Sequence, residues 1–253
     1  SKNTRSQSQN QNLRAATHEI DPAGAQSALT VGDGEYQIES TIIGLNRTGV
    51  TGLMGLKKNL TLGITTLRIG VGDDLEYQIA FNGVVIDDET PGQSEKINGI
   101  NDTILAAKWN LWGKSGSPTA FAIRGALGLP TSDLPTAGDD VDIMLNATWH
   151  RRYRSGQQLE VRLDLGNQDN NGRFEETGGL AVNWFEPASF GGWTFDLNNQ
   201  GLIFGTDYQP TVSIGAEIEL DGSTVIDLGV QHLFDQDNDD DTSGVWIGLT
   251  RRF

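Results

Sequence analysis

The sequence predicts an all-β protein: a transmembrane antiparallel up-and-down β-barrel with short periplasmic turns and longer extracellular loops. Three observations support this prediction. From Gly34 onward, β-branched and aromatic residues alternate with polar ones, which is the period of two that strands require. Short and long connections between these segments alternate along the chain. Pairs of aromatic residues gather beside the short connections, where a membrane interface would lie.

Composition is compatible with a barrel and excludes several other classes. Of the 253 residues, 36% are hydrophobic, which is a thin fraction for a soluble core of this length. No apolar run is long enough for a transmembrane helix, whereas a spanning strand needs about 9 to 11 residues, half of them polar. The net charge of −16 argues against a nucleic-acid partner, because the surface would repel phosphates. The absence of cysteine excludes disulfides and thiol chemistry.

The chain divides into an N-terminal extension, residues 1–33, and a barrel, residues 34–253. The extension is rich in Gln, Asn, Ser and Ala, lacks sustained periodicity, and opens without a charged and apolar leader. It carries Lys2, Arg5 and Arg14, and the predicted lumen wall has more acids than bases. Opposite charge could therefore draw it inward as a plug, although a periplasmic arm or a partner-binding arm fits its composition equally well.

The alternating segments number about twelve. They are expected near residues 35–45, 61–71, 75–85, 102–112, 118–128, 141–153, 158–166, 177–185, 192–200, 209–220, 224–234 and 243–253. Longer polar connections are expected near residues 46–60, 86–101, 129–140, 167–176, 201–208 and 235–242. With an even number of strands, the first strand begins and the last strand ends on the side of the short turns.

The last segment, residues 243–253 (SGVWIGLTRRF), carries Val245, Ile247, Leu249 and the terminal Phe253 on one face. A terminal aromatic residue on an alternating final strand resembles the assembly signal of bacterial outer-membrane barrels. The alternative is an ordinary sheet strand that happens to end in Phe. A soluble β-sandwich also has alternating strands, but it does not require connections of alternating length.

Aromatic residues give a separate indication of a membrane. We expect an interfacial girdle at the short turns. It would consist of the pairs Trp109 and Trp112, Trp149 and Tyr153, Trp184 and Phe185, and Phe190 and Trp193.

If the apolar phase of each strand faces lipid, the other phase lines the lumen and carries charges of both signs. The basic candidates are Arg68, Lys108, Arg124, Arg152 and Arg162; the acidic ones are Glu39, Glu76, Asp142, Glu160, Asp164, Asp196, Glu217, Glu219 and Asp227. Such a wall either holds a narrow barrel together through ion pairs and water or contacts a permeant solute. A barrel of this size lies between barrels filled by side chains and open porins, so a small molecule could pass.

An enzyme would need a nucleophile and a base, and the chain has three histidines. His18 lies in the extension, His150 is predicted to face the lumen, and His232 is predicted at the loop end of a strand. No serine in a glycine-elbow context accompanies them, so we predict no enzyme and no cofactor. Outer-membrane lipases do place Ser and His on a barrel wall; a Ser with a His on the lipid face would therefore favour a lipid-active enzyme.

Two acidic loops resemble cation sites. Residues 235–241 (DQDNDDD) form a cluster of hard oxygen donors, and residues 167–172 (NQDNNG) imitate the first half of a calcium loop. The second loop lacks the Glu expected six residues after its glycine. Solvated loop tips are the better explanation of both, so no metal is predicted.

Three segments resemble the outer-membrane proteins named for the meta pathway of phenol degradation. They are residues 65–77 (TTLRIGVGDDLEY), 99–109 (GINDTILAAKW) and 127–133 (LGLPTSD), in which Ser132 replaces the usual glycine of a Leu-Pro-Thr-Gly-Asp motif. The likeness extends loosely from about residue 34 to the C-terminus. It implies a barrel in a Gram-negative outer membrane, often described as a transporter of hydrophobic or aromatic compounds. These motifs govern turn geometry, so no binding residue can be carried over.

We therefore expect an outer-membrane channel, surrounded by outer-membrane lipid, for passive uptake of small solutes of hydrophobic or aromatic character. The alternative is a structural or partner-binding barrel that conducts nothing and binds a protein through residues 1–33. A lipid-active enzyme is third. A blocked lumen would favour the structural barrel.

Overall fold

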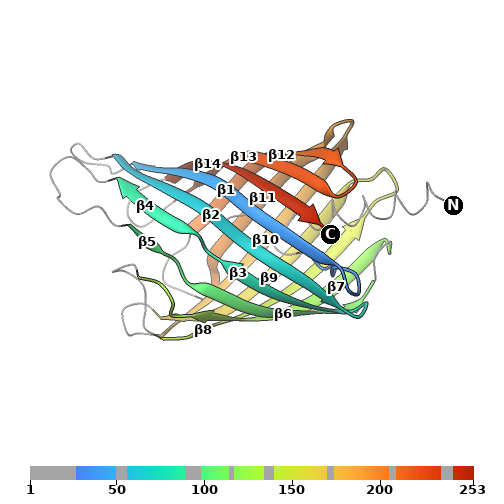
Figure 1. Cartoon of the computed structure of the whole chain (residues 1–253), viewed down its shortest axis with the longest axis horizontal. Coiled ribbons are helices and arrows are strands. Elements are labelled where there is room, and N and C mark those ends of the chain that lie inside the picture. The colour runs from blue at the N-terminus through green and yellow to red at the C-terminus, as the bar shows by residue number, and fades with distance from the viewer. Residues whose placement is uncertain are drawn as a thin grey trace.

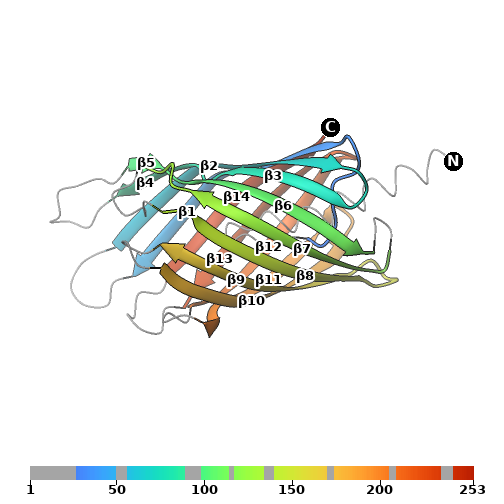
Figure 2. The same cartoon turned by 90° about the horizontal axis from the view of Figure 1, so that it is seen from below.

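The computed structural model describes residues 27–49, 56–88, 98–113, 117–133, 140–169, 174–204, 209–234 and 242–253. These residues form one 14-stranded antiparallel sheet that curls into a barrel, with strands tilted against its long axis (Figures 1 and 2). No described residue is helical, so the described part of the chain holds no helix able to cross a membrane.

The strands follow one another along the chain and pair mainly with their sequence neighbours. Their bounds are β1 (Tyr36–Gly49), β2 (Leu56–Val71), β3 (Leu75–Phe81), β4 (Val84–Asp88), β5 (Asn98–Ile100), β6 (Thr103–Trp112), β7 (Thr119–Leu129), β8 (Asp142–Arg152), β9 (Gln158–Asp169), β10 (Phe174–Ala188), β11 (Gly191–Phe204), β12 (Gln209–Asp221), β13 (Thr224–Leu233) and β14 (Thr242–Arg252).

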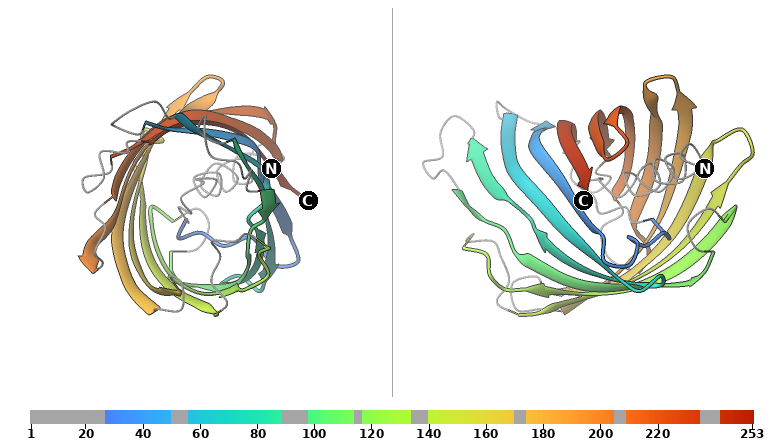
Figure 3. Two further views of the ribbon diagram at one scale, coloured as in Figure 1. Left: turned by 90° about the vertical axis from the view of Figure 1, so that its left-hand side faces the viewer. Right: turned by 45° about the vertical axis from the view of Figure 1, so that its right-hand side comes forward.

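The sheet closes on itself because β1 pairs with β2 on one side and with the last strand, β14, on the other. Two positions in the wall hold interrupted strands. The first position is shared by β3 and β4, which both pair with β2. The next position is shared by β5, which pairs with β4, and β6, which pairs with β3. When each interrupted strand is counted once, the ring has twelve positions. Figure 3 (left) shows the ring along its axis. The predicted twelve-stranded barrel is confirmed.

The two ends of the barrel differ. Tight turns, such as residues 72–74 and 222–223, join strands at one end, which we call the turn end. The last strand also finishes there, since the backbone N–H of Phe253 donates to the carbonyl oxygen of Tyr36 at 2.8 Å. The opposite end, which we call the loop end, carries the longer connections. The C-terminus thus lies where an even number of strands requires.

The strands are longer than predicted at the loop end. The segment expected at 177–185 is Phe174–Ala188, and the one expected at 192–200 is Gly191–Phe204. Apolar alternation fades where side chains leave the lipid, whereas backbone hydrogen bonds continue to pair the strands in water. Hydropathy therefore marks the lipid-facing part of a strand rather than its end.

The two faces of the wall have the polarity of a membrane protein. On β3, Tyr77 is 48% exposed on the outer face, whereas the neighbouring Glu76 is 0% exposed on the inner face. Every second residue of the strand repeats this pattern. A soluble protein buries its apolar side chains; here the apolar phase faces outward, where a bilayer would cover it.

Exposed aromatic residues gather on the outer face near the turn end, including Trp109, Trp112 and Trp193. One predicted member of the girdle was wrong. Phe185 is 1% exposed and points into the barrel, because it shares the phase of the inward-facing Asn183, whereas Trp184 lies on the opposite phase. Adjacent aromatic residues on one strand cannot both face the interface.

A line of irregular backbone, which we call the crease, crosses the wall toward the loop end. It runs from a register shift at Ile42 on β1 through Gly63 on β2 to the breaks at residues 82–83 and 101–102. Gly63 and Gly83 have φ angles of 68° and 75°. A side chain at Gly83 would also overlap the carbonyl oxygen of Leu62, so glycine is required there.

Above the crease, two of the motifs that carry the family resemblance bind each other. The Asp102 carboxylate accepts hydrogen bonds from the backbone N–H groups of Thr131 (2.9 Å) and Ser132 (2.7 Å). In return, the Asp133 carboxylate accepts one from the N–H of Ile100 at 2.5 Å. The hydroxyl of Ser132 donates to the Ile100 carbonyl at 2.8 Å. We call this contact the loop clasp; it fixes backbone rather than a ligand.

Candidate functional site

The inner face of the wall holds the charged side chains that the sequence indicated for the lumen. Eight of the ten principal candidates are buried, and Asp164 and Asp196 are partly exposed. The eight are Arg68, Glu76, Lys108, Arg124, Glu160, Arg162, Glu217 and Asp227. The structure does not distribute them evenly, because most of the basic groups join one network.

Arg68 lies at the centre of that network. Its guanidinium binds Glu39 through Nη1 at 2.7 Å and Glu76 through Nε at 2.6 Å. The Lys108 ammonium lies 3.4 Å from the same Glu76 carboxylate. Both carboxylates also accept hydrogen bonds from side-chain amides: Gln37 donates to Glu39 at 2.6 Å, and Gln78 donates to Glu76 at 2.7 Å. The buried charges are therefore compensated on every side.

The network continues around the wall. Arg124 on β7 donates to Gln78 at 2.8 Å and to Asn146 on β8 at 2.9 Å. Asn146 in turn donates to Asp164 on β9 at 2.6 Å, and Arg162 donates to both oxygens of that carboxylate. These bonds form one connected chain of side chains from β1 to β9, which we call the polar belt.

The described end of the extension lies inside the barrel against this belt. Figure 3 (left) shows the blue segment that precedes β1 running inside the ring. Lys108 donates to the carbonyl oxygens of Ser27 (3.2 Å) and Leu29 (2.7 Å), and Asn110 donates to that of Ala28 (2.7 Å). Side chains of the wall thus satisfy the backbone of a segment that has no strand partner of its own.

Further contacts fix the same segment at the turn end. The N–H of Val31 donates to Glu76 at 2.8 Å, so the central acid of the belt also holds the extension. Gly70 allows the close approach, because a Cβ there would overlap the carbonyl oxygen of Gly32. Residues 1–26, with Lys2, Arg5, Arg14 and His18, lie outside the described residues.

The other half of the inner wall, from β10 to β14, also carries buried polar side chains, such as Asn183, Thr194 and Ser213. It contains two aromatic side chains that the sequence analysis missed. Phe185 on β10 packs against Gly192, and Trp246 on β14 packs against Gly229. Both aromatic residues are buried. Strand alternation could have predicted the inward face of Trp246, because it lies between the outward-facing Val245 and Ile247.

Acidic candidates accompany these aromatic residues. Asp196 accepts a hydrogen bond from the Ser213 hydroxyl at 3.2 Å, and Glu217 and Asp227 are direct cross-strand neighbours on β12 and β13. His150 and Glu160 form a cross-strand pair on β8 and β9, with Nδ1 3.0 Å from Oε1. Among the described residues, no group of three His or acidic side chains is placed to hold a metal ion. The acidic loop 235–241 and residues 170–172 of the calcium-like loop lie outside them.

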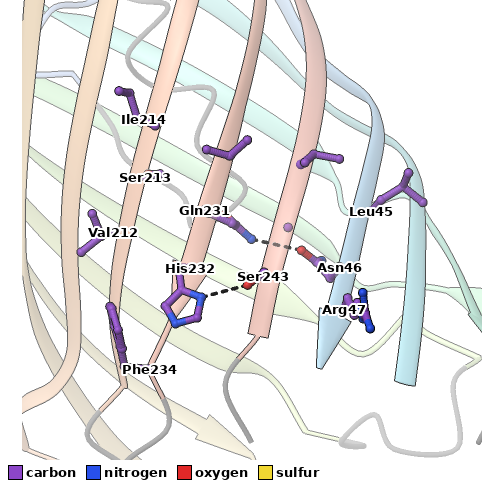
Figure 4. A pocket seen from close by; sticks show the side chains of 13 residues that line it. Leu45, Asn46, Arg47, Val212, Ser213, Ile214, Gln231, His232, Phe234 and Ser243 are labelled. Atoms are coloured by element: carbon purple, nitrogen blue, oxygen red, sulfur yellow. Dashed lines mark hydrogen bonds between the residues drawn. The ribbon is translucent and has the colours of Figure 1, made fainter. Parts of the chain in front are cut away.

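The third histidine lies on the outer face. His232 Nδ1 is 2.9 Å from the Ser243 hydroxyl oxygen on the neighbouring strand, and the imidazole ring packs edge-on against Phe234 with centroids 4.4 Å apart. Figure 4 shows the pair in a shallow groove of the outer wall. This is the Ser and His combination on the lipid face that would favour a lipid-active enzyme.

The comparisons with known proteins give a fold. No protein-family model and no curated protein matches the chain. Among solved structures, it is similar to the COG4313 outer membrane channel from Pseudomonas putida F1, with a TM-score of 0.64 and 10% identity over 88% of this chain and 97% of that one.

Two further structures are similar. The translocator domain of autotransporter NalP from Neisseria meningitidis has a TM-score of 0.53 and 14% identity over 100% of this chain and 98% of that one. The CymD monoaromatic hydrocarbon channel has a TM-score of 0.51 and 9% identity over 88% of this chain and 89% of that one. The chain therefore has the fold of the transmembrane β-barrels of outer membranes, and its structural neighbours include channels.

Proposed function

We propose that the chain forms a channel in the outer membrane of a Gram-negative bacterium and admits small hydrophobic or aromatic solutes by passive diffusion. The observation that carries the proposal is a closed barrel whose apolar residues face outward and whose inner wall is polar on one half and partly aromatic on the other. Two barrels of similar fold are an outer membrane channel and a monoaromatic hydrocarbon channel, which supports the same function here.

The division of the inner wall favours an apolar solute over an ion. Phe185 and Trp246 are buried aromatic rings in the half of the inner wall opposite the polar belt, so a solute would stack on them only once the groups that cover them move. The charges of the belt compensate one another, so they would attract a free ion only weakly. A small aromatic solute could pass along the half of the wall that carries the two rings.

The extension is the element that we propose to control passage. Five hydrogen bonds between wall side chains and the backbone of residues 27–31, four donated by the wall and one accepted by Glu76, anchor its described end inside the barrel. An arm that only trailed into the periplasm would not need buried Lys and Arg partners. A non-conducting barrel that uses residues 1–33 to bind a protein partner is the second candidate.

Deletion of residues 1–30 tests the plug. We expect it to raise single-channel conductance in planar bilayers and to accelerate uptake of small aromatic solutes into liposomes. Lys108→Met, which removes two of the anchoring hydrogen bonds, should change both quantities in the same direction but less. Arg154→Gln, in an exposed turn, is the matched control. If the full-length and truncated forms both assemble yet neither admits any solute, the structural barrel replaces the channel.

We also propose that the chain belongs to the family named for the meta pathway of phenol degradation. The support is the loop clasp, in which the Gly-x-x-Asp and Leu-Pro-Thr motifs hold each other through Asp102 and Asp133. Motifs that contact each other are expected to occur together. The test is deletion of this chain from the host cell. Slower breakdown of an aromatic compound would support membership, and unchanged growth on all such compounds would contradict it.

We infer that the chain is not an enzyme, even though His232 meets Ser243 on the outer face. An acyl-transfer site needs backbone N–H groups free to stabilise an oxyanion. Here β13 and β14 are each paired on both sides, so the N–H groups around the two residues are engaged in the sheet. Purified protein should release no fatty acid from phospholipid vesicles; release abolished by Ser243→Ala would overturn this inference.

A further inference from the structure

The outer face carries one row of polar residues near the loop end. Successive register pairs join Val212 on β12 to His232 on β13, His232 to Ser243 on β14, and Ser243 to Arg47 on β1. The next register position, on β2, is Lys58. We call His232, Ser243 and Arg47 the rim row. Ring closure assembles it, since Arg47 comes from the first strand and Ser243 from the last.

Two residues closer to the turn end, the outward-facing residues of the same strands are apolar. Val230 is 49% exposed, Val245 48% and Leu45 49%, all on the outer face. The outward phase therefore becomes polar at one level on β13, β14 and β1, although Val212 at the same level on β12 and Phe234, the next outward residue on β13, are apolar. Such a change lies near the upper edge of the lipid-facing band.

Strand geometry gives the same level. Eight residues separate Thr224, at the start of β13, from His232. At about 3.3 Å per residue and a tilt of about 40°, they rise about 20 Å along the barrel axis. The apolar band of an outer-membrane barrel is about 25 Å tall, so the rim row lies in the upper part of this band, close to the lipid headgroups.

The rim row and the apolar residues beside it line a groove of about 770 Å³ in the outer wall, drawn in Figure 4. Short side chains create it: Ser243 separates the larger His232 and Arg47, and valines line the floor at positions 212, 230 and 245. The groove joins an apolar floor to a polar upper edge. A ligand that fits both must carry apolar chains below a hydrogen-bonding headgroup.

We propose that this groove binds a phosphate-bearing, acylated lipid of the outer leaflet. The guanidinium of Arg47 is a bidentate donor suited to phosphate, and either the Ser243 hydroxyl or the His232 imidazole can donate beside it, depending on which of the two donates in the hydrogen bond between them. Acyl chains would lie against Val230, Val245 and Leu45. The inference requires the membrane placement proposed above but not the transport of any solute.

Charge favours this occupant over others. The chain carries a net charge of −16, so an anion is repelled by most of its surface and needs a local reason to bind. Arg47, which lines the groove, supplies that reason. A neutral solute would gain nothing from this charge.

The test measures lipid binding by the full-length protein in detergent micelles, with diphosphorylated lipid A as the probe and the same lipid without phosphates as the comparison. We expect the phosphorylated probe to bind at least tenfold tighter. Arg47→Gln should weaken its binding about tenfold, the loss expected for one charge-assisted hydrogen bond, and should leave the dephosphorylated lipid unaffected. Arg47→Gln with His232→Gln should weaken it further.

Two variants complete the design. Arg151→Gln removes an exposed arginine at the turn end and should leave binding within about twofold of wild type. Val245→Trp fills the groove without changing charge and should weaken binding of both lipids. Equal affinity for the two lipids, unchanged binding by Arg47→Gln, or displacement of the probe by millimolar inorganic phosphate would overturn the proposal. So would an altered oligomeric state of Arg47→Gln with normal lipid binding. Conductance is measured separately, so failure of this site would leave the channel proposal standing.

Discussion

Arg68 and Glu76 form a two-bond ion pair inside the barrel, with Nε 2.6 Å from Oε1 and Nη2 2.7 Å from Oε2. The two residues stand on β2 and β3, which a three-residue turn connects. Because the Glu76 carboxylate also accepts the N–H of Val31, this one pair joins the wall to the extension. A change in it should affect both the stability of the barrel and access to the lumen.

Glu76→Gln should destabilise the barrel by about 3 kcal/mol, because it removes a charge on which buried Arg68 and Lys108 both depend. The free energy of unfolding can be measured by urea titration in detergent, followed by tryptophan fluorescence. Glu176→Gln, at an exposed position on β10, is the control and should change it by less than about 0.5 kcal/mol. Equal losses in both variants would mean that the ion pair contributes nothing specific.

Leu163→Arg tests which phase faces lipid. Leu163 lies on the outer face, so a charge there should cost about 2 to 4 kcal/mol near the bilayer midplane. Arg162→Leu, at the next residue and on the inner face, should cost less, because Asp164 keeps its hydrogen bond from Asn146. Reversible folding into lipid vesicles would measure both variants. The opposite ranking would show that the two faces had been exchanged.

Asp102→Ala should open the loop clasp without unfolding the barrel. It leaves the N–H groups of Thr131 and Ser132 without their carboxylate, a local loss of about 1 to 3 kcal/mol. Protease cleavage within residues 129–133 should accelerate, while heat-dependent migration on gels stays normal. Asp221→Ala removes a turn-capping carboxylate at the other end and should not affect cleavage there. An intact 129–133 segment in Asp102→Ala would refute the clasp.

Removal of Phe253 should impair assembly into the outer membrane. Its ring is 62% exposed at the turn end, with the Arg251 guanidinium 5.2 Å from its centroid, so it is available to an assembly factor. The fraction of outer-membrane protein that migrates as a folded band without boiling measures the effect. Phe253→Tyr keeps an aromatic ring and should assemble normally. Assembly of the shortened chain at the wild-type level would refute the role of the C-terminus.

Local alternation was enough to predict the face of residues such as Glu76, which was assigned to the inner face from period alone and is 0% exposed there. The number of alternating segments predicted the twelve wall positions. The segments expected at 75–85 and 102–112 instead contain or adjoin the crease, because a backbone break does not disturb hydropathy. The rim row could not be predicted either, since only closure of β1 on β14 brings Arg47 beside Ser243. Phe185 could have been assigned to the inner face from strand alternation, but it was grouped with the neighbouring Trp184 because both are aromatic.

The crease divides the wall into two tiers that should open independently. Above it, β4 and β5 pair over only a few residues, and glycines interrupt the hydrogen-bond ladder that would otherwise couple them to the membrane-spanning part. Backbone amides of Leu60 and Ile86 should therefore exchange with solvent deuterium well before those of Leu67 and Ile79. The loop-end corner of this barrel can fray and re-form while the ring beneath it stays closed.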